Sequence, residues 1–495
     1  MFSSNSLAKG PLKLGKESLS VEAAAGQLMM VGIGGTAVDK KLAKHLRQIK
    51  PGSIILFKRN LPSAVSAKKF TASLQNLKIN QLPLIIAIDQ EGGDVVRLQT
   101  QPPMPSAYSL ASSMDNSFIR SYSERISEYM QSAGINMNLA PVLDLADPKQ
   151  ISFLGARSFG NNAALVGQAG LAFAEGHIAN FVVPVAKHFP GMGHTSTDPH
   201  FSVGKVNLSL EHLLRDSVVP FASFSGLGRF TGMMMSHFVY PAIDDERPAS
   251  LSQKNMSLLR DRLKYKGLII TDDLQMDAVK SQLALEDAAV LSLKAGADIV
   301  MVAYSPKAQL KVRQRIVRAI QKGELSTQEV QEKLQRISFV KEVINKAPKT
   351  TVPRMLALRN FSDFDNDLLK KKISKISRAP SSESPKNKFC LLSDVSSFRE
   401  SFRASVGKKK TSTVHFKDLK DIKSNKISSC DLFVLAVSRK DSSAQLKNLN
   451  TFILEKSLIV NLGLPALTAG LESYQVVNLD FPHAQAGKKI AQLLK

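Results

Sequence analysis

Eight short apolar runs recur along the first 304 residues of the chain, and amphipathic stretches separate them. Most runs hold Ile, Val, Leu and Met over four to eight residues, as expected for parallel strands that are buried on both faces. Strands that alternate with helices predict an α/β fold, and eight such units predict a (β/α)8 TIM-type barrel. The runs are GQLMMVGIG (26–34), SIILF (53–57), LPLIIAID (82–89), INMNLAPVLDL (135–145), FVVPVAKHF (181–189), GMMMSHFVY (232–240), GLIITDD (267–273) and ADIVMVAY (297–304).

A doubly wound open sheet would show the same alternation of strands and helices. That fold usually carries a glycine-rich phosphate-binding turn after its first strand. The sequence has no such turn after the first predicted strand, which favours the barrel.

At 495 residues the chain exceeds one typical domain. We predict an N-terminal arm over 1–20, a barrel domain over 21–347 and a linker over 348–388, where Lys, Ser and Pro accumulate. Residues 389–495 return to short apolar runs between helix-like pieces, which predicts a second, smaller α/β domain at the C-terminus.

Two cysteines, Cys390 and Cys430, are too few for a disulfide framework or a four-cysteine zinc site. The first twenty residues contain no continuous apolar segment of the secretory type, and no stretch is long enough to span a bilayer. We therefore expect a cytoplasmic protein without a membrane partner.

The formal net charge is +24, and half of the excess follows residue 365, where 23 lysines and arginines stand against 11 acids. A nucleic-acid surface would combine basic residues on one face with aromatic ones. Here the lysines are scattered, tyrosine is sparse and tryptophan is absent. We interpret the charge as a solvated basic surface, with an anionic cell-wall or nucleic-acid partner as the alternative.

Polar residues stand at the carboxyl ends of the predicted strands, where a barrel gathers its chemistry. The candidates are Asp89, Asp144, Arg157 in the loop after Asp144, Lys187, His188, Ser236, His237, Asp272 and Asp273.

Asp272 directly follows the apolar run LIIT and suits a nucleophile, a base or a metal ligand, provided that cations or donors keep it ionised. Its structural alternative is the N-cap of the next helix, a role that suits Asp273 better. Lys187 and His188 suit substrate binding, since an ammonium offers three donors to sugar hydroxyls or a carboxylate. The alternative for His188 is a buried histidine with satisfied hydrogen bonds.

The loop after the fifth strand, AKHFPGMGHTSTDPH (186–200), contains a further pair, Asp198 and His200. In an extended segment residues i and i+2 point the same way, so the carboxylate can orient the imidazole as a proton shuttle near neutral pH. A zinc site of His188, His194, Asp198 and His200 would have suitable residue types. The gaps between these residues match no familiar ligand spacing, so we expect no metal.

These motifs occur in a familiar order. From about residue 20 to 345 the chain closely resembles glycoside hydrolase family 3, and within it the β-N-acetylglucosaminidase (NagZ-type) branch. Residues 390–495 resemble a reduced form of the second domain that many members carry. The matching motifs are GSIILFKRN, IDQEGG, VRL, NLAPVLDL, ARSFG, AKHFPG, SHFVYPAID, PASLS, LRDRLKYKGLIITDDLQM and LKAGAD.

The resemblance implies a retaining exo-β-N-acetylglucosaminidase that removes non-reducing terminal GlcNAc from peptidoglycan fragments during cell-wall recycling. It implies a covalent intermediate on Asp272, with His200 as acid/base and Asp198 as the partner of that histidine. No metal or organic cofactor is implied, and the oligomeric state is left open. The sugar-contacting residues that it implies are Asp89, Arg97, Arg157, Lys187 and His188.

The sequence departs from the family pattern at Met192, His194, Pro199 and Asp94, where the family usually has His, Asp, Ser and Arg. Pro199 lies between the two partners of the proposed proton shuttle and restricts the backbone there. A catalytically impaired sugar-binding protein is therefore an alternative, and a β-glucosidase or β-xylosidase of the same family is another. A histidine as acid/base repels phosphate less than a carboxylate would, so transfer to phosphate also stays open. Catalysis assisted by the acetamido group usually needs neighbouring carboxylates, such as Asp272 and Asp273, but the Asp198–His200 pair and the order of the motifs argue against it.

Overall fold

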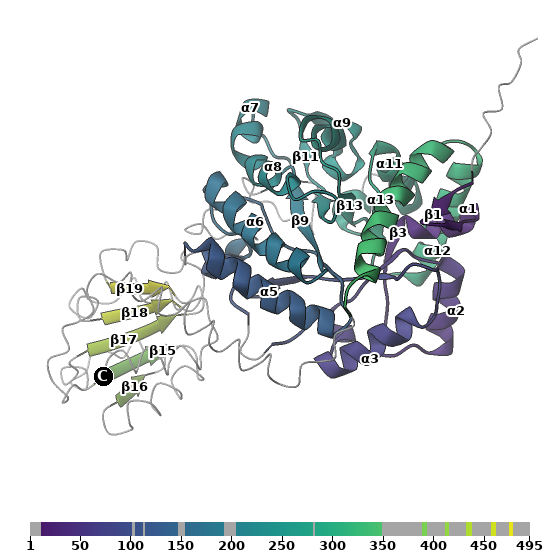
Figure 1. Cartoon of the computed structure of the whole chain (residues 1–495). Helices are drawn as coiled ribbons and strands as arrows, with labels where there is room; N and C mark the ends of the chain where they lie inside the picture. Colours follow the sequence, from purple (N-terminus) through teal and green to yellow (C-terminus); the bar gives the residue numbers. More distant parts are fainter. Residues whose placement is uncertain are drawn as a thin grey trace, which may run out of the picture.

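A computed structural model gives the fold (Figure 1). It describes residues 11–100, 104–111, 114–146, 154–192, 204–280 and 283–348, together with the strands of a second sheet between 389 and 478.

Eight parallel strands form a closed barrel, and strands that follow one another in the barrel series are neighbours in space. Each strand falls within one of the predicted runs, so the predicted barrel is confirmed. The strands are β3 (Met29–Gly32), β4 (Ser53–Ile55), β5 (Ile85–Ile88), β8 (Met137–Asn138), β9 (Val183–Phe189), β10 (Gly232–Met235), β13 (Leu268–Asp273) and β14 (Ile299–Val302).

Helices surround the barrel, and most of them start at a side-chain cap (Figure 1). Asp39, Ser63 and Asn162 are examples whose side-chain oxygens accept a backbone N–H in the first turn. The helices are α1 (Val21–Gln27), α2 (Lys40–Ile49), α3 (Ala64–Gln75), α4 (Ala107–Ala111), α5 (Asn116–Ser132), α6 (Ala163–Ala179), α7 (Leu210–His212), α8 (Val219–Ser225), α9 (Gln253–Ser257), α10 (Asp277–Lys280), α11 (Leu285–Ala295), α12 (Pro306–Gln321) and α13 (Thr327–Asn345).

The strands are buried on both faces, as their continuous apolar sequences predict. Every residue of β9 is buried, including Lys187 and His188 at its carboxyl end. Gly32 on β3 has no room for a side chain, because a Cβ would collide with the backbone carbonyl of Ala303 after β14. Tight packing of the core therefore fixes the positions of the strand ends. The polar residues at those ends are held in fixed positions as well.

Short hairpins decorate the barrel. Two follow strands at the carboxyl end, β6 (Gln90–Gly92) with β7 (Val95–Val96) and β11 (Val239–Tyr240) with β12 (Asp244–Pro248). A third, β1 (Lys13–Leu14) with β2 (Glu17–Ser18), lies within the predicted arm. The amide of Lys13 donates to Gln331 Oε1 on α13 at 2.7 Å, so this part of the arm is attached to the barrel domain.

The second sheet has five parallel strands in the order β16-β15-β17-β18-β19. Four of these strands lie in the short apolar runs of this region, KFCLLSD, CDLFVLAVS, KSLIVNLG and YQVVNLD, and the fifth lies in the segment TSTV, which is not such a run. The strands are β15 (Phe389–Ser393), β16 (Thr411–Val414), β17 (Leu432–Val437), β18 (Ser457–Asn461) and β19 (Gln475–Asn478). None of the helices in the described part of the chain has the length and apolar character needed to cross a membrane.

Candidate active site

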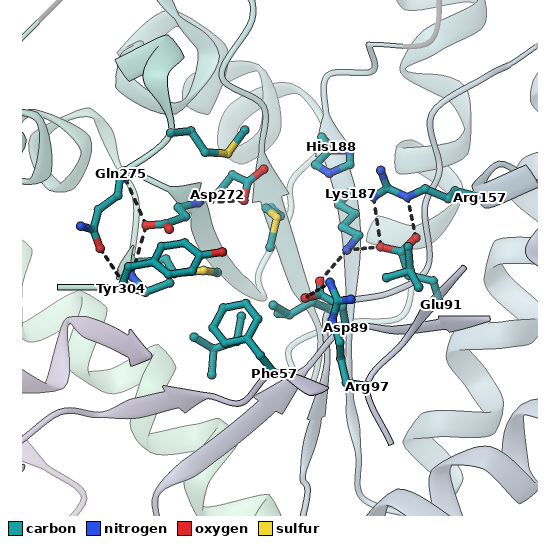
Figure 2. A pocket seen from close by; sticks show the side chains of 18 of the residues that line it. Phe57, Asp89, Glu91, Arg97, Arg157, Lys187, His188, Asp272, Gln275 and Tyr304 are labelled. Atoms are coloured by element: carbon teal, nitrogen blue, oxygen red, sulfur yellow. Dashed lines mark hydrogen bonds and ion pairs between the residues drawn. The ribbon is translucent and has the colours of Figure 1, made fainter. Parts of the chain in front are cut away.

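A pocket of about 450 Å³ lies at the carboxyl ends of the barrel strands (Figure 2). Its size is in the range of small-molecule sites. Charged side chains line one part and apolar or aromatic side chains line another. Its lining includes Ile55, Phe57, Asp89, Glu91, Val95, Arg97, Leu139, Arg157, Lys187, His188, Met192, Met234, Asp272, Asp273, Gln275, Met276, Asp277, Met301, Ala303 and Tyr304.

Four charged residues form one side of the pocket, which we call the polar wall: Asp89, Glu91, Arg157 and Lys187 (Figure 2). Lys187 Nζ lies 2.9 Å from Asp89 Oδ1 and 2.5 Å from Glu91 Oε1. Arg157 binds Glu91 through Nε at 2.8 Å and Nη2 at 3.1 Å. Such paired charges hold one another in fixed positions and retain spare donors and acceptors for a ligand's hydroxyl groups.

Opposite charges in the polar wall offset the effect of burial on the pKa values of Glu91 and Lys187. Burial alone would raise the pKa of Glu91, but Arg157 and Lys187 outweigh it and hold that pKa far below its usual range. Burial alone would lower the pKa of Lys187, but Asp89 and Glu91 outweigh it and raise that pKa. Glu91 and Lys187 therefore keep their charges despite their burial.

The β6–β7 hairpin carries Glu91 and Arg97 to the pocket. Gln90 Oε1 accepts the amide of Arg97 at 3.0 Å, which holds the two strands of the hairpin together. Gly92 adopts a φ of 101°, and a Cβ there would collide with the carbonyl of Pro105. A glycine is therefore required at this bend. Arg97 Nη2 lies 3.5 Å from Asp89 Oδ2, at the edge of the polar wall.

His188 is held by a buried carboxylate. Asp144 Oδ2 lies 2.6 Å from His188 Nδ1 and also accepts the backbone amide of His188 at 3.1 Å. The other oxygen of Asp144 accepts the amide of Met192 at 2.8 Å. Among the described residues, His188 Nε2 has no hydrogen-bond partner, and the residue lines the pocket. Asp144 therefore orients the imidazole so that Nε2 can contact a ligand.

Asp272 stands at the end of β13, between the polar wall and the opposite side of the pocket (Figure 2). Its Oδ1 accepts the amide of Asp273 at 2.7 Å. Burial alone would raise the pKa of Asp272, but His237, His188, the Asp273 amide and Lys187 outweigh it and lower that pKa. Asp272 is therefore an ionised carboxylate that points at the place where a ligand would lie.

Asp273 and His237 support the backbone behind Asp272. Asp273 Oδ1 accepts the amides of Gln275 at 3.1 Å and Ala303 at 3.2 Å, a structural role of the kind expected for Asp273 rather than Asp272. His237 Nε2 donates to the backbone carbonyl of Asp273 at 3.0 Å, and its Nδ1 lies 2.7 Å from Ser250 Oγ. These bonds fix the imidazole of His237, which is one cause of the lowered pKa of Asp272.

The side of the pocket opposite the polar wall carries two aromatic rings, Phe57 and Tyr304, which we call the aromatic wall (Figure 2). Their ring centroids lie 5.6 Å apart at an interplanar angle of 23°. Gln275 Oε1 accepts the backbone amide of Tyr304 at 2.7 Å and so fixes the start of the loop that carries the ring.

The structure brings six of the eight predicted site residues into this one pocket, namely Asp89, Arg97, Arg157, Lys187, His188 and Asp272. Their chemical roles stay predictions. Asp198 and His200 lie outside the described residues, and so do His194 and Pro199.

Two of the departures from the family pattern are within the described residues. Met192 is buried and lines the pocket, and the amide that it donates to Asp144 anchors the chain where it enters the segment 193–203. Asp94 is exposed at the tip of the β6–β7 hairpin and is not part of the pocket lining. The change to Asp94 therefore leaves the polar wall intact.

Sequence reasoning missed Glu91 and the aromatic wall. Glu91 is part of the motif IDQEGG, but no spacing in the sequence predicts that it contacts Arg157 or Lys187. Phe57 and Tyr304 are the last residues of two predicted apolar runs, so they were counted with the core. Aromatic residues at the carboxyl end of a barrel strand were the available signal.

Comparison with known proteins shows the family of the chain that forms this pocket. A model of the glycosyl hydrolase family 3 N terminal domain matches residues 20–340. An uncharacterized secreted glycosyl hydrolase of Arthroderma benhamiae is 35% identical over 322 residues, which covers 63% of this chain and 91% of that protein. A β-hexosaminidase of Pseudomonas aeruginosa is 32% identical over 254 residues, covering 50% of this chain and 74% of the enzyme.

Solved structures extend the likeness over both domains. A glycoside hydrolase family 3 β-N-acetylglucosaminidase from Paenibacillus superposes with a TM-score of 0.81, covering 96% of this chain and 97% of that one. Its sequence identity of 23% supports the shared fold.

Proposed function

The chain belongs to glycosyl hydrolase family 3 and is a glycoside hydrolase, and from that premise we propose that it is a retaining exo-β-N-acetylglucosaminidase. The observation that carries the proposal is the position of Asp272, an ionised carboxylate opposite a wall of sugar-binding charges. The β-hexosaminidases among its relatives support an N-acetylhexosaminide as substrate.

The polar wall suits the hydroxyl groups of a terminal sugar. Asp89 and Glu91 accept hydrogen bonds, Lys187, Arg157 and Arg97 donate them, and His188 Nε2 faces the same space. Several donors and acceptors fixed by their own ion pairs hold a pyranose in one orientation with little loss of side-chain entropy. We assign these residues to binding of the non-reducing terminal sugar.

In the proposed first step, a carboxylate oxygen of Asp272 attacks the anomeric carbon while the bond to the leaving oxygen breaks. His200 gives its proton to that oxygen, so the alcohol leaves neutral and a glycosyl ester of Asp272 remains. In the second step His200 takes a proton from water, the water oxygen attacks the anomeric carbon, and the ester bond to Asp272 breaks. Asp198 would orient His200 in both steps.

The lowered pKa of Asp272 suits the nucleophile because the carboxylate stays ionised despite its burial. A histidine as acid/base adds no negative charge to the pocket. Met192 is the last described residue before the segment that carries His200, and it lines the pocket. This position of Met192 supports the assignment of the acid/base to that segment.

We propose that the natural substrates are peptidoglycan fragments with a terminal GlcNAc, and that the enzyme recycles them in the cytoplasm. The β-hexosaminidase relatives support the sugar; the compartment is an expectation from the sequence alone.

The test is release of nitrophenol from the β-N-acetylglucosaminide and the β-glucoside, in buffers with and without inorganic phosphate. We expect the acetamido sugar to be preferred and phosphate to have no effect. Preference for the glucoside would replace the proposal with a β-glucosidase. Faster turnover with phosphate and a sugar phosphate as product would replace it with a phosphorylase. GlcNAc binding without turnover would indicate a sugar receptor.

A further inference from the structure

A buried amide holds the backbone between the two acids of the polar wall. Gln90 separates Asp89 from Glu91, and the amide belongs to Asn138, the last residue of β8. Asn138 Oδ1 accepts the backbone amide of Gln90 at 2.9 Å, and Asn138 Nδ2 donates to the carbonyl of Gln90 at 3.0 Å. One side chain therefore binds both backbone groups of the residue that joins the two acids.

These two bonds continue the pairing of β5 with β8. The backbone amide of Leu139 donates to the carbonyl of Ile88 at 2.8 Å, as in a parallel ladder. At Gln90, where β5 has ended, the side chain of Asn138 takes the place of the backbone of β8 as the hydrogen-bonding partner. The path of the chain after β5 therefore depends on this one side chain.

The side chain of Gln90 passes this restraint on to the β6–β7 hairpin. Its Oε1 accepts the amides of Arg97 and Leu98 at 3.0 Å each, and its Nε2 donates to the carbonyl of Leu98 at 2.8 Å. Gln90 is fully buried. A shift of Asn138 would therefore move Gln90, and with it the hairpin that carries Glu91 and Arg97.

A buried histidine stands behind the amide. Asn138 Nδ2 lies 2.9 Å from Nε2 of His177, in the last turn of α6. His177 Nδ1 lies 2.7 Å from Ser123 Oγ on α5 and 3.0 Å from the carbonyl of Phe173. Asn138 and His177 are both fully buried, and neither is on the lining of the pocket. Both nitrogens of the imidazole therefore have a partner inside the protein.

These contacts assign one tautomer to His177. The amide of Gln90 fixes Asn138 Oδ1, so the group that faces the imidazole is Nδ2, which can only donate. His177 Nε2 must therefore accept, and Nδ1 carries the proton towards Ser123 and Phe173. Burial lowers the pKa of His177 to about 4, so the neutral ring that this arrangement needs is the form present near neutral pH.

Resting on the proposed function, we propose that Asn138 and His177 are positioning residues for the terminal sugar. Asn138 holds Gln90, and Gln90 fixes the places of Asp89 and Glu91, whose carboxylates accept hydrogen bonds from the sugar. His177 acts one step further back, because it keeps the amide of Asn138 in the orientation that binds Gln90. Neither residue belongs to an ion pair of the polar wall, so both can be changed without altering the charge of the pocket.

Calorimetric titration with GlcNAc tests the proposal, because binding of this sugar needs no turnover. Asn138→Ala should weaken GlcNAc about tenfold, since both bonds to Gln90 are lost. His177→Leu should weaken it about threefold to fivefold, since the amide loses its acceptor. His177→Gln should return the affinity to within about twofold of the wild type, because a glutamine oxygen can accept where Nε2 does.

Thr71→Val is the matched control, because it also removes a buried hydrogen bond. Thr71 Oγ1 on α3 donates to the carbonyl of Ala133, before β8, at 2.8 Å. Urea unfolding should show a loss of stability in this variant, and its affinity for GlcNAc should equal that of the wild type. Added to Glu91→Gln, His177→Leu should weaken GlcNAc by no more than about twofold, because one of the acids that it positions is already neutral.

The proposal is overturned by unchanged affinity in Asn138→Ala and His177→Leu, by an equal loss in Thr71→Val, or by no recovery in His177→Gln. A wild type that does not bind GlcNAc would also overturn it. Nitrophenol release by the wild type reports separately on the proposed function. A chain that binds GlcNAc with these responses and releases no nitrophenol would support the two positioning roles and contradict the proposed hydrolysis.

Discussion

Lys187 and Lys341 are buried at opposite ends of the barrel, and their surroundings differ. At the pocket end Lys187 contacts two carboxylates, which raise its pKa against the effect of burial. At the opposite end Lys341 on α13 is fully buried, and its Nζ donates to the neutral Gln27 Oε1 at 2.9 Å. Burial lowers the pKa of Lys341 to about 7.

This difference in surroundings indicates that the charge of Lys187 serves ligand binding, whereas a charge on Lys341 is only tolerated by the fold. Lys187 is ionised because removing its proton would take away the cation that Asp89 and Glu91 share. Lys341 can shed its proton near neutral pH, since an amine still donates to Gln27. Fixed charges hold Lys187, whereas Lys341 is held by packing and by one hydrogen bond to a neutral amide.

The largest effect is expected from Lys187→Met. Losing the ammonium removes the cation that Asp89 and Glu91 share and leaves each acid with one arginine, so the variant should lose about 3–5 kcal/mol in the free energy of unfolding. The value of kcat/KM for the nitrophenyl β-N-acetylglucosaminide should fall by about a hundredfold or more, because the sugar is no longer positioned. Urea unfolding and nitrophenol release measure the two losses. Wild-type kinetics in this variant would show that the polar wall does not bind the sugar.

Glu91→Gln should have the next largest effect. Glu91 is a positioning residue, because it holds Lys187 and Arg157 in place. The neutral amide loosens both cations, and we expect kcat/KM to fall by about tenfold to a hundredfold. Circular dichroism should show that the variant is folded, and Glu124→Gln on the exposed face of α5 is the matched control. A loss no larger than in that control would reduce Glu91 to a structural acid.

Lys341→Met should stabilise the protein at low pH and leave turnover intact. The folded pKa near 7 lies below the ordinary value of 10.5, so the unfolded chain binds the proton more tightly. The cost of burying this lysine is therefore full below about pH 7 and disappears as the pH rises towards 10.5.

The gain from Lys341→Met should be about 1–3 kcal/mol at pH 6 and smaller at pH 9.5. Unfolding free energies of both proteins at the two pH values measure it. A gain that grows with pH would mean that Lys341 is charged and paired in the folded protein. The proposed difference between Lys187 and Lys341 would then be wrong.

The smallest effect concerns the pH profile. His237 is a cause of the lowered pKa of Asp272, so His237→Gln should raise that pKa. The acid limb of the kcat/KM profile should therefore move to higher pH, since the nucleophile must be ionised. His212→Gln, at an exposed position, is the control. An acid limb that stays in place would mean that His237 supports only the backbone of Asp273.

The barrel could be predicted from the sequence because each strand is a local signal: a continuous apolar run identifies β9 or β13 without knowledge of its neighbours. The residues at the strand ends followed from the same pattern, so Asp89, Lys187 and Asp272 were found together. The fold then guarantees that they meet, since the carboxyl ends of parallel barrel strands share one rim.

The contacts of Glu91 and of Lys341 could not be predicted, because they join residues far apart in the chain. Glu91 stands in the β6–β7 hairpin, whereas its cations come from β9 and from the loop after β8, and Lys341 sits in an ordinary helical pattern. Phe57 and Tyr304 were hidden for the opposite reason, since an aromatic residue at the end of an apolar run looks like core. What periodicity cannot show is which side of a strand end faces a pocket.

The most direct measurement of the central claim is to trap the intermediate. The wild type is incubated with an activated 2-fluoro glycoside, and the labelled peptide is identified by mass spectrometry. We expect one sugar per chain, attached to Asp272, with activity returning as the ester hydrolyses. Asp272→Ala should take up no label. A label on another carboxylate, or an active enzyme that is never labelled, would contradict the assignment of Asp272 as nucleophile.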